Sequence, residues 1–598
     1  MSLPWLSQPV MLHSNRDPGK CSMTPDQCAY KTSYWVFWYE ADHRYGLPTI
    51  AFFLAAILLV AIGHQTATAA PVSLRRNPTW LRVVSLGRFM SYKSWRVKSW
   101  NSQSLAVYLL GAAGAVFFSA MTLGPRPYYW PNTKTLSFGN SPPIATRAGY
   151  MALACMPFLF LLGAKSNPIT ALTGVSHEKL NVWHNWVAWA MFVLALVHTF
   201  PFIIFHIWKG DIVKQWNDGG MWVTGVIALL AQAWLTFMSV RWIRDKYYEF
   251  FKATHLFAAA VFFVFFFIHC DFRLTSWDYF VATAVLYALC WFYTLFRTFM
   301  EHGVSRARLT MATPDSLVVE IETSTRWTPG QHVYLRFLAC GPHALTAHPF
   351  TIASVPQKGQ HSCMVFYIKP RGGITGRLAK MAGRSPGVTV PVLLDGPYGG
   401  VTSRWFRGFD RTLIVAGGSG AGFSLPLIED FLRSRADISE KAKLRVVVAS
   451  RDPRFREWYS RALDDLLTQV GRADDKTNRV SVQIHETHDE LVEQMQASNE
   501  EAGQLGKEAN ESSTDVSAER RAISLHGQIV VESFVGRPSA ETIAQAVTQE
   551  PGTVGMVVCG PSSMVFDLRQ AAAAAQKRIV RGEAGVSEVW FYNESFSY

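Results

Sequence analysis

Two apolar segments each carry a pair of histidines at the same spacing. His184 and His198 stand 14 positions apart in VWHNWVAWAMFVLALVHTF, and His255 and His269 stand 14 apart in HLFAAAVFFVFFFIH. Fourteen helical residues fall about 40° short of four turns and rise about 21 Å, so each pair lies on one helix face at two depths. Because ionisable side chains are costly inside a membrane helix, they usually mark a functional site there.

Four neutral imidazoles at two depths are typical of two haems, each clamped by two histidines between facing helices. Zinc sites have more closely clustered ligands and often thiolates. A proton relay commonly uses Asp or Glu, and the interiors of these segments contain neither. The sequence therefore predicts two haem b groups bound by His184, His198, His255 and His269. Three histidines near the ends of apolar segments are interpreted as interfacial: His64, His177 and His206.

Seven stretches are long and apolar enough to form the helices that position these residues, since a bilayer takes about 20 helical residues to cross. They are residues 47–65, 104–123, 146–164, 182–207, 220–240, 250–270 and 278–297. The loop after the first stretch is basic, from Arg75 to Lys98, and the loop after the fifth carries Arg241, Arg244 and Lys246. Basic loops remain in the cytosol. We therefore expect the N-terminus outside and the C-terminal half in the cytosol.

This topology also orders the histidines. His184 is paired in depth with His255 on the inner side, and His198 with His269 on the outer side. The net charge of +13 is explained by the basic loops and by anionic cofactors, so no nucleic acid is expected as a partner.

The first residues lack a charged start followed by an apolar core, which predicts that no cleavable signal peptide is present.

Cys21 and Cys28 lie in the segment expected outside, where a disulfide is permitted and free thiols are equally compatible. The cysteines in or beside the apolar segments are interpreted as packing residues: Cys155, Cys270 and Cys290.

The C-terminal half changes from short alternating segments to a β/α pattern. RARLTMATPDSLVVEIET and GQHVYLRFL are typical of strands in an antiparallel barrel. From Arg411, RTLIVAGGSGAGFSLPLIEDFL indicates a strand, a glycine-rich loop and a helix, as in a parallel nucleotide-binding sheet. The loop glycines allow backbone amides to approach a pyrophosphate, although a plain structural turn is the alternative. They are Gly417, Gly418, Gly420 and Gly422.

The acidic, polar stretch 486–521 is predicted to be a disordered surface insertion.

Taken together, these residues resemble the ferric reductase and NADPH oxidase superfamily over residues 145–598, and most closely its fungal ferric/cupric reductases. The resemblance implies that the two histidine pairs ligate haem. It implies that HPFTIAS binds FAD through His348, Pro349, Phe350, Thr351 and Ser354, and that GGIT holds the FAD pyrophosphate through Gly373 and Thr375. GGSGAG and CGPSSM resemble NADPH-binding motifs, with Cys559, Gly560 and Pro561 near the nicotinamide. FYNESFSY resembles the C-terminal motif whose aromatic residues cover the flavin. Many members end in Trp, so whether Phe596 or Tyr598 stacks on the flavin stays open.

The predicted fold is a multi-domain membrane protein: an α-helical transmembrane bundle of about seven spans with a six-helix haem-binding core, a cytosolic antiparallel β-barrel for FAD, and an α/β Rossmann-like domain for NADP. The expected bounds are 1–46 for an extracytoplasmic segment, 47–300, 301–405 and 406–598.

The predicted function is NADPH-dependent reduction of Fe(III) or Cu(II) chelates outside a membrane, with electrons passing through FAD and two haems. NADPH is favoured over NADH because Arg451 follows the second Rossmann strand, where a cation can meet the 2′-phosphate. We expect the plasma membrane as location and metal-uptake proteins as possible partners.

One alternative is a superoxide-generating NADPH oxidase. Another is a channel or transporter with a soluble sensor domain, which leaves the equal histidine spacings unexplained.

Overall fold

The computed structural model describes residues 21–34, 41–75, 77–98, 100–218, 220–271, 276–314, 316–339, 341, 344, 346–357, 361–433, 442–452, 454–470, 479–487, 519–526 and 529–594. The chain divides into two units, which are described in turn. One contains Met1–Gln65 and Leu109–Tyr293, and the other contains Thr66–Tyr108 and Thr294–Ser597.

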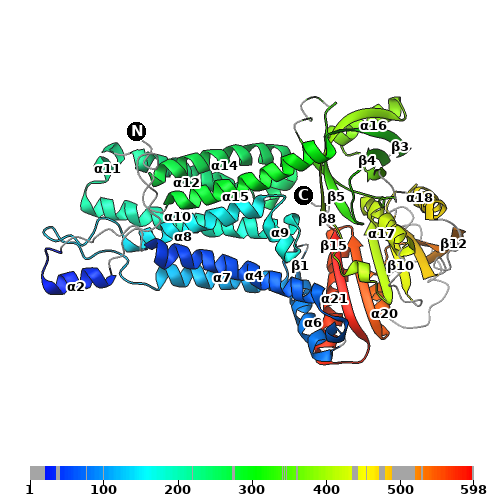
Figure 1. The fold of residues 1–598 in the computed structure, drawn as a ribbon, viewed down its shortest axis with the longest axis horizontal. Coiled ribbons are helices and arrows are strands. Elements are labelled where there is room, and N and C mark those ends of the chain that lie inside the picture. Colours follow the sequence, from blue (N-terminus) through cyan, green and yellow to red (C-terminus); the bar gives the residue numbers. More distant parts are fainter. Residues whose placement is uncertain are drawn as a thin grey trace, which may run out of the picture. The chain divides into compact units, whose positions relative to one another are not determined.

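The first unit is built from long apolar helices (Figure 1). Seven helices within the described ranges are long and apolar enough to cross a membrane, which confirms the predicted number. They are α4 (Leu47–Ala69), α7 (Leu105–Leu123), α8 (Pro143–Gly163), α10 (His177–Lys209), α12 (Gly220–Phe237), α14 (Tyr248–Cys270) and α15 (Ser276–Phe296). Shorter helices accompany them: α2 (Pro25–Tyr34), η1 (Asp42–Gly46), α9 (Pro168–Thr173), α11 (Ile212–Asp218) and α13 (Arg241–Lys246).

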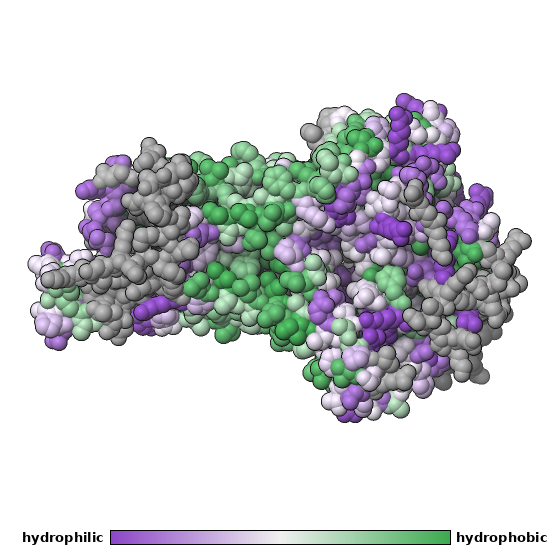
Figure 2. Space-filling model, in the orientation of Figure 1, coloured by the Kyte–Doolittle hydropathy of each residue, from purple (hydrophilic) through white to green (hydrophobic). Residues whose placement is uncertain are grey.

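Helix α8 is the buried helix of this unit. Small residues along it, including Ala145, Ala148 and Ala152, let its neighbours approach closely, and α10 packs along it. Other helices present large apolar side chains outward, for example Leu59 on α4 and Phe257 on α14, which are 71% and 73% exposed. Figure 2 shows hydrophobic residues covering the surface of these helices, as expected for a surface that contacts lipid.

A disulfide joins Cys21 to Cys28, with the second cysteine on α2. The sequence left this pairing open. Cys155 and Cys290 are buried free thiols, as expected of packing residues, whereas Cys270 is partly exposed.

The second unit contains a six-stranded antiparallel sheet in the order β6-β5-β8-β3-β4-β7. Its strands are β3 (Val304–Thr313), β4 (Ser316–Thr323), β5 (Gln331–Phe337), β6 (His348–Thr351), β7 (Ser362–Ile368) and β8 (Val388–Gly399), with helix α16 (Gly373–Arg384) and the π-helix η2 (Arg297–His302). Alternate residues of β4 and β7 face one core, which includes Leu317, Ile321 and Phe366. The antiparallel pairing predicted for this segment is confirmed.

A seven-stranded sheet follows in the order β12-β13-β11-β10-β9-β14-β15. All its pairings are parallel except that of β12 with β13. The strands are β9 (Arg411–Gly417), β10 (Lys443–Ser450), β11 (Val480–Glu486), β12 (Glu519–His526), β13 (Ile529–Val535), β14 (Gly552–Cys559) and β15 (Val586–Glu594). Helices η4 (Trp405–Arg407), η5 (Gly418–Gly420), α17 (Ala421–Arg433), α18 (Phe455–Val470), α20 (Ala540–Gln549) and α21 (Ser562–Arg581) complete it. The predicted parallel α/β sheet is confirmed. Because β10 and β14 flank β9 on opposite sides, the strand order reverses at β9, where α/β proteins bind ligands.

The predicted insertion 486–521 is shorter than expected at both ends. Glu486 closes β11 and Glu519 opens β12, because backbone pairing with β13 continues to these positions. Residues 488–518 lie outside the described residues.

The basic loop after α4 is a folded arm that belongs to the second unit. It comprises α5 (Val72–Arg75), α6 (Pro78–Tyr92) and a hairpin of β1 (Arg96–Val97) and β2 (Trp100–Asn101). Asn77 caps α6 by accepting from the backbone N–H groups of Thr79 and Trp80. Helix α6 packs on α21, so this basic loop also contacts a helix that covers the α/β sheet.

Candidate redox sites

The four predicted haem ligands meet as two pairs inside the helical unit. The ring centroids of His184 and His255 are 6.3 Å apart, and those of His198 and His269 are 6.1 Å apart. Helices α10 and α14 thus bring together the histidines that the sequence paired by depth.

A backbone carbonyl fixes the ring of three of these histidines. Nδ1 of His184 lies 2.9 Å from the Leu159 carbonyl oxygen, Nδ1 of His198 lies 2.8 Å from that of Ala145, and Nδ1 of His269 lies 2.7 Å from that of Met221. A carbonyl oxygen only accepts, so Nδ1 donates its hydrogen and the lone pair resides on Nε2. Each ring is therefore held in the tautomer that a metal ligand needs.

Glycine makes room for each of these three contacts. Gly163, Gly149 and Gly225 stand four residues after the three accepting carbonyls. A Cβ at Gly149 would lie 2.5 Å from Nδ1 of His198, and one at Gly225 would lie 2.7 Å from that of His269. At Gly163 the corresponding distance to His184 is 3.2 Å. At Gly149 and Gly225 only a residue without a side chain lets the imidazole reach the helix backbone, whereas at Gly163 a Cβ would require a shift of a few tenths of an ångström.

These pairs fit a bis-histidine metal site. Metal–imidazole bonds of about 2 Å on both sides match two rings whose centroids are about 6 Å apart. The glycines were missed by sequence reasoning, although Gly149 and Gly163 repeat the 14-residue spacing of the histidines.

The histidines interpreted as interfacial are engaged with protein groups. His206 is buried, and its Nδ1 lies 2.7 Å from Asp211 Oδ1. His177 is buried beside Glu178, with an Nδ1–Oε1 distance of 3.0 Å. The ring of His64 packs against Gly174.

The predicted FAD motif lies at the edge of the antiparallel sheet. Strand β6 contains His348, Pro349, Phe350 and Thr351, and all four are partly exposed. The Thr351 hydroxyl oxygen is nevertheless buried and has no hydrogen-bond partner among the described residues. Because an unsatisfied buried hydroxyl is costly, this atom fits a site completed by a bound molecule.

Ser354 has a structural role in the same motif. Its hydroxyl donates to the Cys363 carbonyl at 2.8 Å and accepts from the Val365 N–H at 3.1 Å. It thereby ties the motif to β7.

Helix α16 begins in the GGIT segment. Gly372 and Gly373 have φ values of 155° and 51°, which favour glycine. The Thr375 hydroxyl donates to the Gly372 carbonyl at 3.0 Å and accepts from the Arg371 N–H at 3.1 Å. The segment is therefore a preformed turn at a helix N-terminus, which suits a phosphate.

The two predicted NADPH loops meet backbone to backbone at the end of β9 and β14. A Cβ at Gly420 would lie 2.5 Å from the Cys559 carbonyl oxygen, and a Cβ at Gly560 would lie 3.1 Å from the Gly417 nitrogen. Gly418 has a φ of 58°, and a Cβ at Gly422 would meet Tyr367 at 3.3 Å. Pro561 packs on Gly417 before α21 begins. Gly420 and Gly560 are thus needed for close approach and Gly418 for its backbone conformation, and the edge they form fits a dinucleotide.

Sequence reasoning missed two titratable residues, Glu594 and His332. Glu594 on β15 is the register partner of Cys559, and the Nδ1 of His332 lies 3.8 Å from Glu594 Oε1. Burial, and then the Glu594 charge, raise the pKa of the Cys559 thiol well above its usual value. Cys559 is therefore a neutral thiol at physiological pH rather than a nucleophile.

Arg451 follows β10 and is exposed, and its contact with a ligand phosphate stays a prediction. Phe596 and Tyr598, predicted to cover the flavin, lie outside the described residues.

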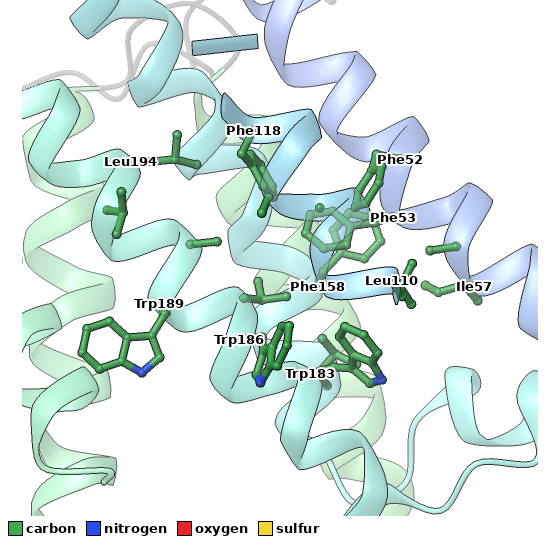
Figure 3. A pocket seen from close by; sticks show the side chains of 18 of the residues that line it. Phe52, Phe53, Ile57, Leu110, Phe118, Phe158, Trp183, Trp186, Trp189 and Leu194 are labelled. Carbon is green, nitrogen blue, oxygen red and sulfur yellow. The ribbon is translucent and has the colours of Figure 1, made fainter. Parts of the chain in front are cut away.

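A large apolar cavity lies between α4, α7, α8, α9 and α10. Its volume is about 520 Å³. Figure 3 shows Trp183, Trp186 and Trp189 of α10 with Phe52 and Phe158 around it. None of the described residues that line it is titratable.

Three family models match the chain in order and together cover more than half of it. They are the ferric reductase like transmembrane component over residues 148–266, the FAD-binding domain over 302–402 and the ferric reductase NAD binding domain over 409–573.

Curated relatives agree with these matches. A probable cell surface ferric reductase (kap2) of Aspergillus oryzae is 31% identical, covering 60% of this chain and 50% of its own length. Ferric/cupric reductase transmembrane component 7 of Saccharomyces cerevisiae is 29% identical, covering 68% and 64%. The chain thus spans half the length of the first relative and less than two thirds of the second. A ferredoxin NADP+ reductase structure from Neisseria gonorrhoeae aligns at 16% identity with a TM-score of 0.30, covering 48% of this chain and 98% of that chain. The chain belongs to the ferric reductase family, and the two relatives named above are a fungal ferric reductase and a fungal ferric/cupric reductase.

Proposed function

We propose that the chain is a transmembrane, NADPH-dependent metalloreductase that transfers electrons from cytosolic NADPH to Fe(III) or Cu(II) chelates outside, in support of metal uptake. The observation that carries this proposal is the pair of imidazole sites at two depths of a helical unit whose chain also has FAD-binding and NAD-binding domains.

His184, His198, His255 and His269 would hold two haem b groups. The carbonyls of Leu159, Ala145 and Met221 orient three of these rings, and the helices that carry the histidines are long and apolar enough to cross a membrane. The hydrogen bond from Nδ1 to a carbonyl would hold each of these three rings in one orientation and leave its Nε2 to ligate a haem.

When bound, nicotinamide supplies two electrons as hydride, flavin divides the pair, and haem carries electrons singly. The residues of the chain would hold these groups in position. Thr351 and its neighbours in β6 would hold the flavin, and the α16 N-terminus its pyrophosphate. Gly417, Gly420 and Gly560 would receive the dinucleotide, with the neutral Cys559 thiol and Glu594 at the site of hydride transfer.

We further propose that the basic arm and the C-terminal half face the cytosol and that the protein resides in the plasma membrane. The domain bounds proposed are 1–46, 47–300, 301–405 and 406–598. NADPH would be preferred through Arg451.

The test is reduction of an impermeant ferric chelate by intact cells that express the chain, with superoxide dismutase as control. We expect reduction that dismutase does not affect, and purified protein that contains two haems per chain. Dismutase-sensitive reduction would identify a superoxide-generating oxidase, and protein without haem would contradict the proposed path.

A further inference from the structure

The fourth histidine departs from the pattern that the other three share. Ser239 stands 14 residues after Gly225 on the same segment, where the pattern calls for glycine. Nδ1 of His255 lies 3.2 Å from Ser239 Oγ, and that hydroxyl donates to the Leu235 carbonyl four residues earlier. The hydroxyl hydrogen is thus used, so Oγ accepts the hydrogen of Nδ1. The Ser239 hydroxyl oxygen thus lies between the His255 ring and the Leu235 carbonyl, which is the acceptor expected from the pattern.

Serine in place of glycine at position 239 weakens the hydrogen bond that His255 makes through Nδ1. The three carbonyl contacts measure 2.7–2.9 Å, whereas the hydroxyl contact measures 3.2 Å. A strong acceptor at Nδ1–H raises the electron density on Nε2 and makes imidazole a stronger donor to a metal. A stronger donor favours the oxidised, more highly charged metal, so hydrogen bonding to the ligand is one of the protein's means of setting a haem potential.

The two sites therefore differ by one hydrogen bond. Both rings of the His198–His269 pair are bonded to carbonyls, while the His184–His255 pair has one carbonyl and one hydroxyl. We propose that Ser239 is a positioning residue that raises the reduction potential of the haem held by His184 and His255, and so makes the first acceptor after the flavin easier to reduce. This inference rests on the proposed function, since it requires haem at both sites.

Three variants of full-length, haem-loaded protein test it by spectroelectrochemical titration of the two haem transitions. Ser239→Gly lets the ring reach the Leu235 carbonyl, so one midpoint potential should move down. Ser239→Ala keeps a Cβ in the way but removes the acceptor, so the same midpoint should move up. Ser239→Thr retains the hydroxyl and should leave the midpoint near that of the original protein.

A matched control is Thr236→Ala on α12, the helix that ends two residues before Ser239. The Thr236 hydroxyl also donates to a carbonyl four residues earlier, that of Gln232 at 2.8 Å, and its removal should move neither midpoint. The low-spin EPR signal of the affected haem should change in Ser239→Gly and Ser239→Ala only.

The transition is assigned to a site with His198→Leu, which should retain only the haem of the His184–His255 pair. The inference is overturned if Ser239→Gly and Ser239→Ala shift the midpoint in the same direction, shift the other haem or leave both unchanged. Failure of the proposed function has a different signature, because the original protein would then lack the two haem transitions altogether.

Discussion

Arg88 and Glu588 lie 500 positions apart in the chain and form an ion pair with an Nη1–Oε1 distance of 3.0 Å. Arg404 donates to the same carboxylate at 2.6 and 2.9 Å. Burial alone would raise the pKa of Glu588, but the hydrogen bonds and charges of Arg404 and Arg88 outweigh it and lower the pKa to about 2. One carboxylate on β15 thus holds both the arm helix α6 and the segment that leads into β9.

Glu588→Gln should destabilise the second unit in a pH-dependent way. Because the folded pKa lies below the ordinary value of 4.5, the stabilisation is complete above pH 4.5 and is lost as the pH falls through about 2. Its size is about 3 kcal/mol, at about 1.4 kcal/mol per pKa unit. Thermal unfolding of purified protein at pH 7 and pH 3 should show a large loss for the variant at pH 7 and a smaller one at pH 3.

The control for this variant is Asp567→Asn, which removes another ion pair of the arm. The Arg96–Asp567 pair is more than a third exposed on both sides, so its loss should cost less than about 1 kcal/mol. Equal losses for the two variants would contradict a special role of Glu588.

Gly149→Ala and Gly225→Ala should each remove the haem of the His198–His269 pair. The added methyl group would lie within 2.7 Å of an imidazole atom, so the ring must leave its carbonyl. Gly220→Ala on α12 is the matched control, because nothing lies within 4 Å of a Cβ there. Haem content per chain should fall from two to one in the first two variants and stay at two in the control. Two haems in Gly149→Ala would contradict the assigned packing.

The histidine pairs could be predicted because helical periodicity alone determines which residues share a face. The same rule applied to glycine would have found Gly149 and Gly163, which make room for the rings to reach the carbonyls of Ala145 and Leu159. By contrast, the partners of the arm could not be predicted. The positive charges of this loop indicated the cytosolic side, but nothing local to Arg88 points to a carboxylate 500 positions away. The Glu594–His332 contact was missed for the same reason, since it depends on the packing of two sheets.

Thr351→Val should have opposite effects with and without FAD. In the absence of flavin it removes a buried hydroxyl that has no partner, so stability should stay equal or increase. With flavin it removes a hydrogen bond, so the flavin Kd should rise about tenfold, corresponding to about 1.4 kcal/mol. Flavin titration and thermal unfolding measure the two effects. Thr553→Val, which breaks a bond to Asp410, should lower stability without changing the flavin Kd.

Arg451→Ala should reduce the preference for NADPH. The side chain follows β10 and is exposed, so its removal takes away a cation for the 2′-phosphate without disturbing the core. The ratio of kcat/KM for NADPH to that for NADH should fall, mainly through a higher KM for NADPH. An unchanged ratio would show that another residue reads the phosphate.

The last prediction concerns the order in which the two histidine pairs receive electrons. The basic arm and the Arg241–Lys246 segment are expected in the cytosol, which puts His184 and His255 nearer the flavin. His198→Leu should therefore remove one haem and leave the other reducible by NADPH, while chelate reduction is lost. His184→Leu should instead block the first transfer, so that any haem left at the His198–His269 pair stays oxidised when NADPH is added. Haem content and the NADPH-reduced spectrum of each variant measure this, after membrane insertion has been checked. If the haem remaining in His198→Leu stays oxidised with NADPH while that in His184→Leu is reduced, the order of the pairs is the reverse of the one proposed.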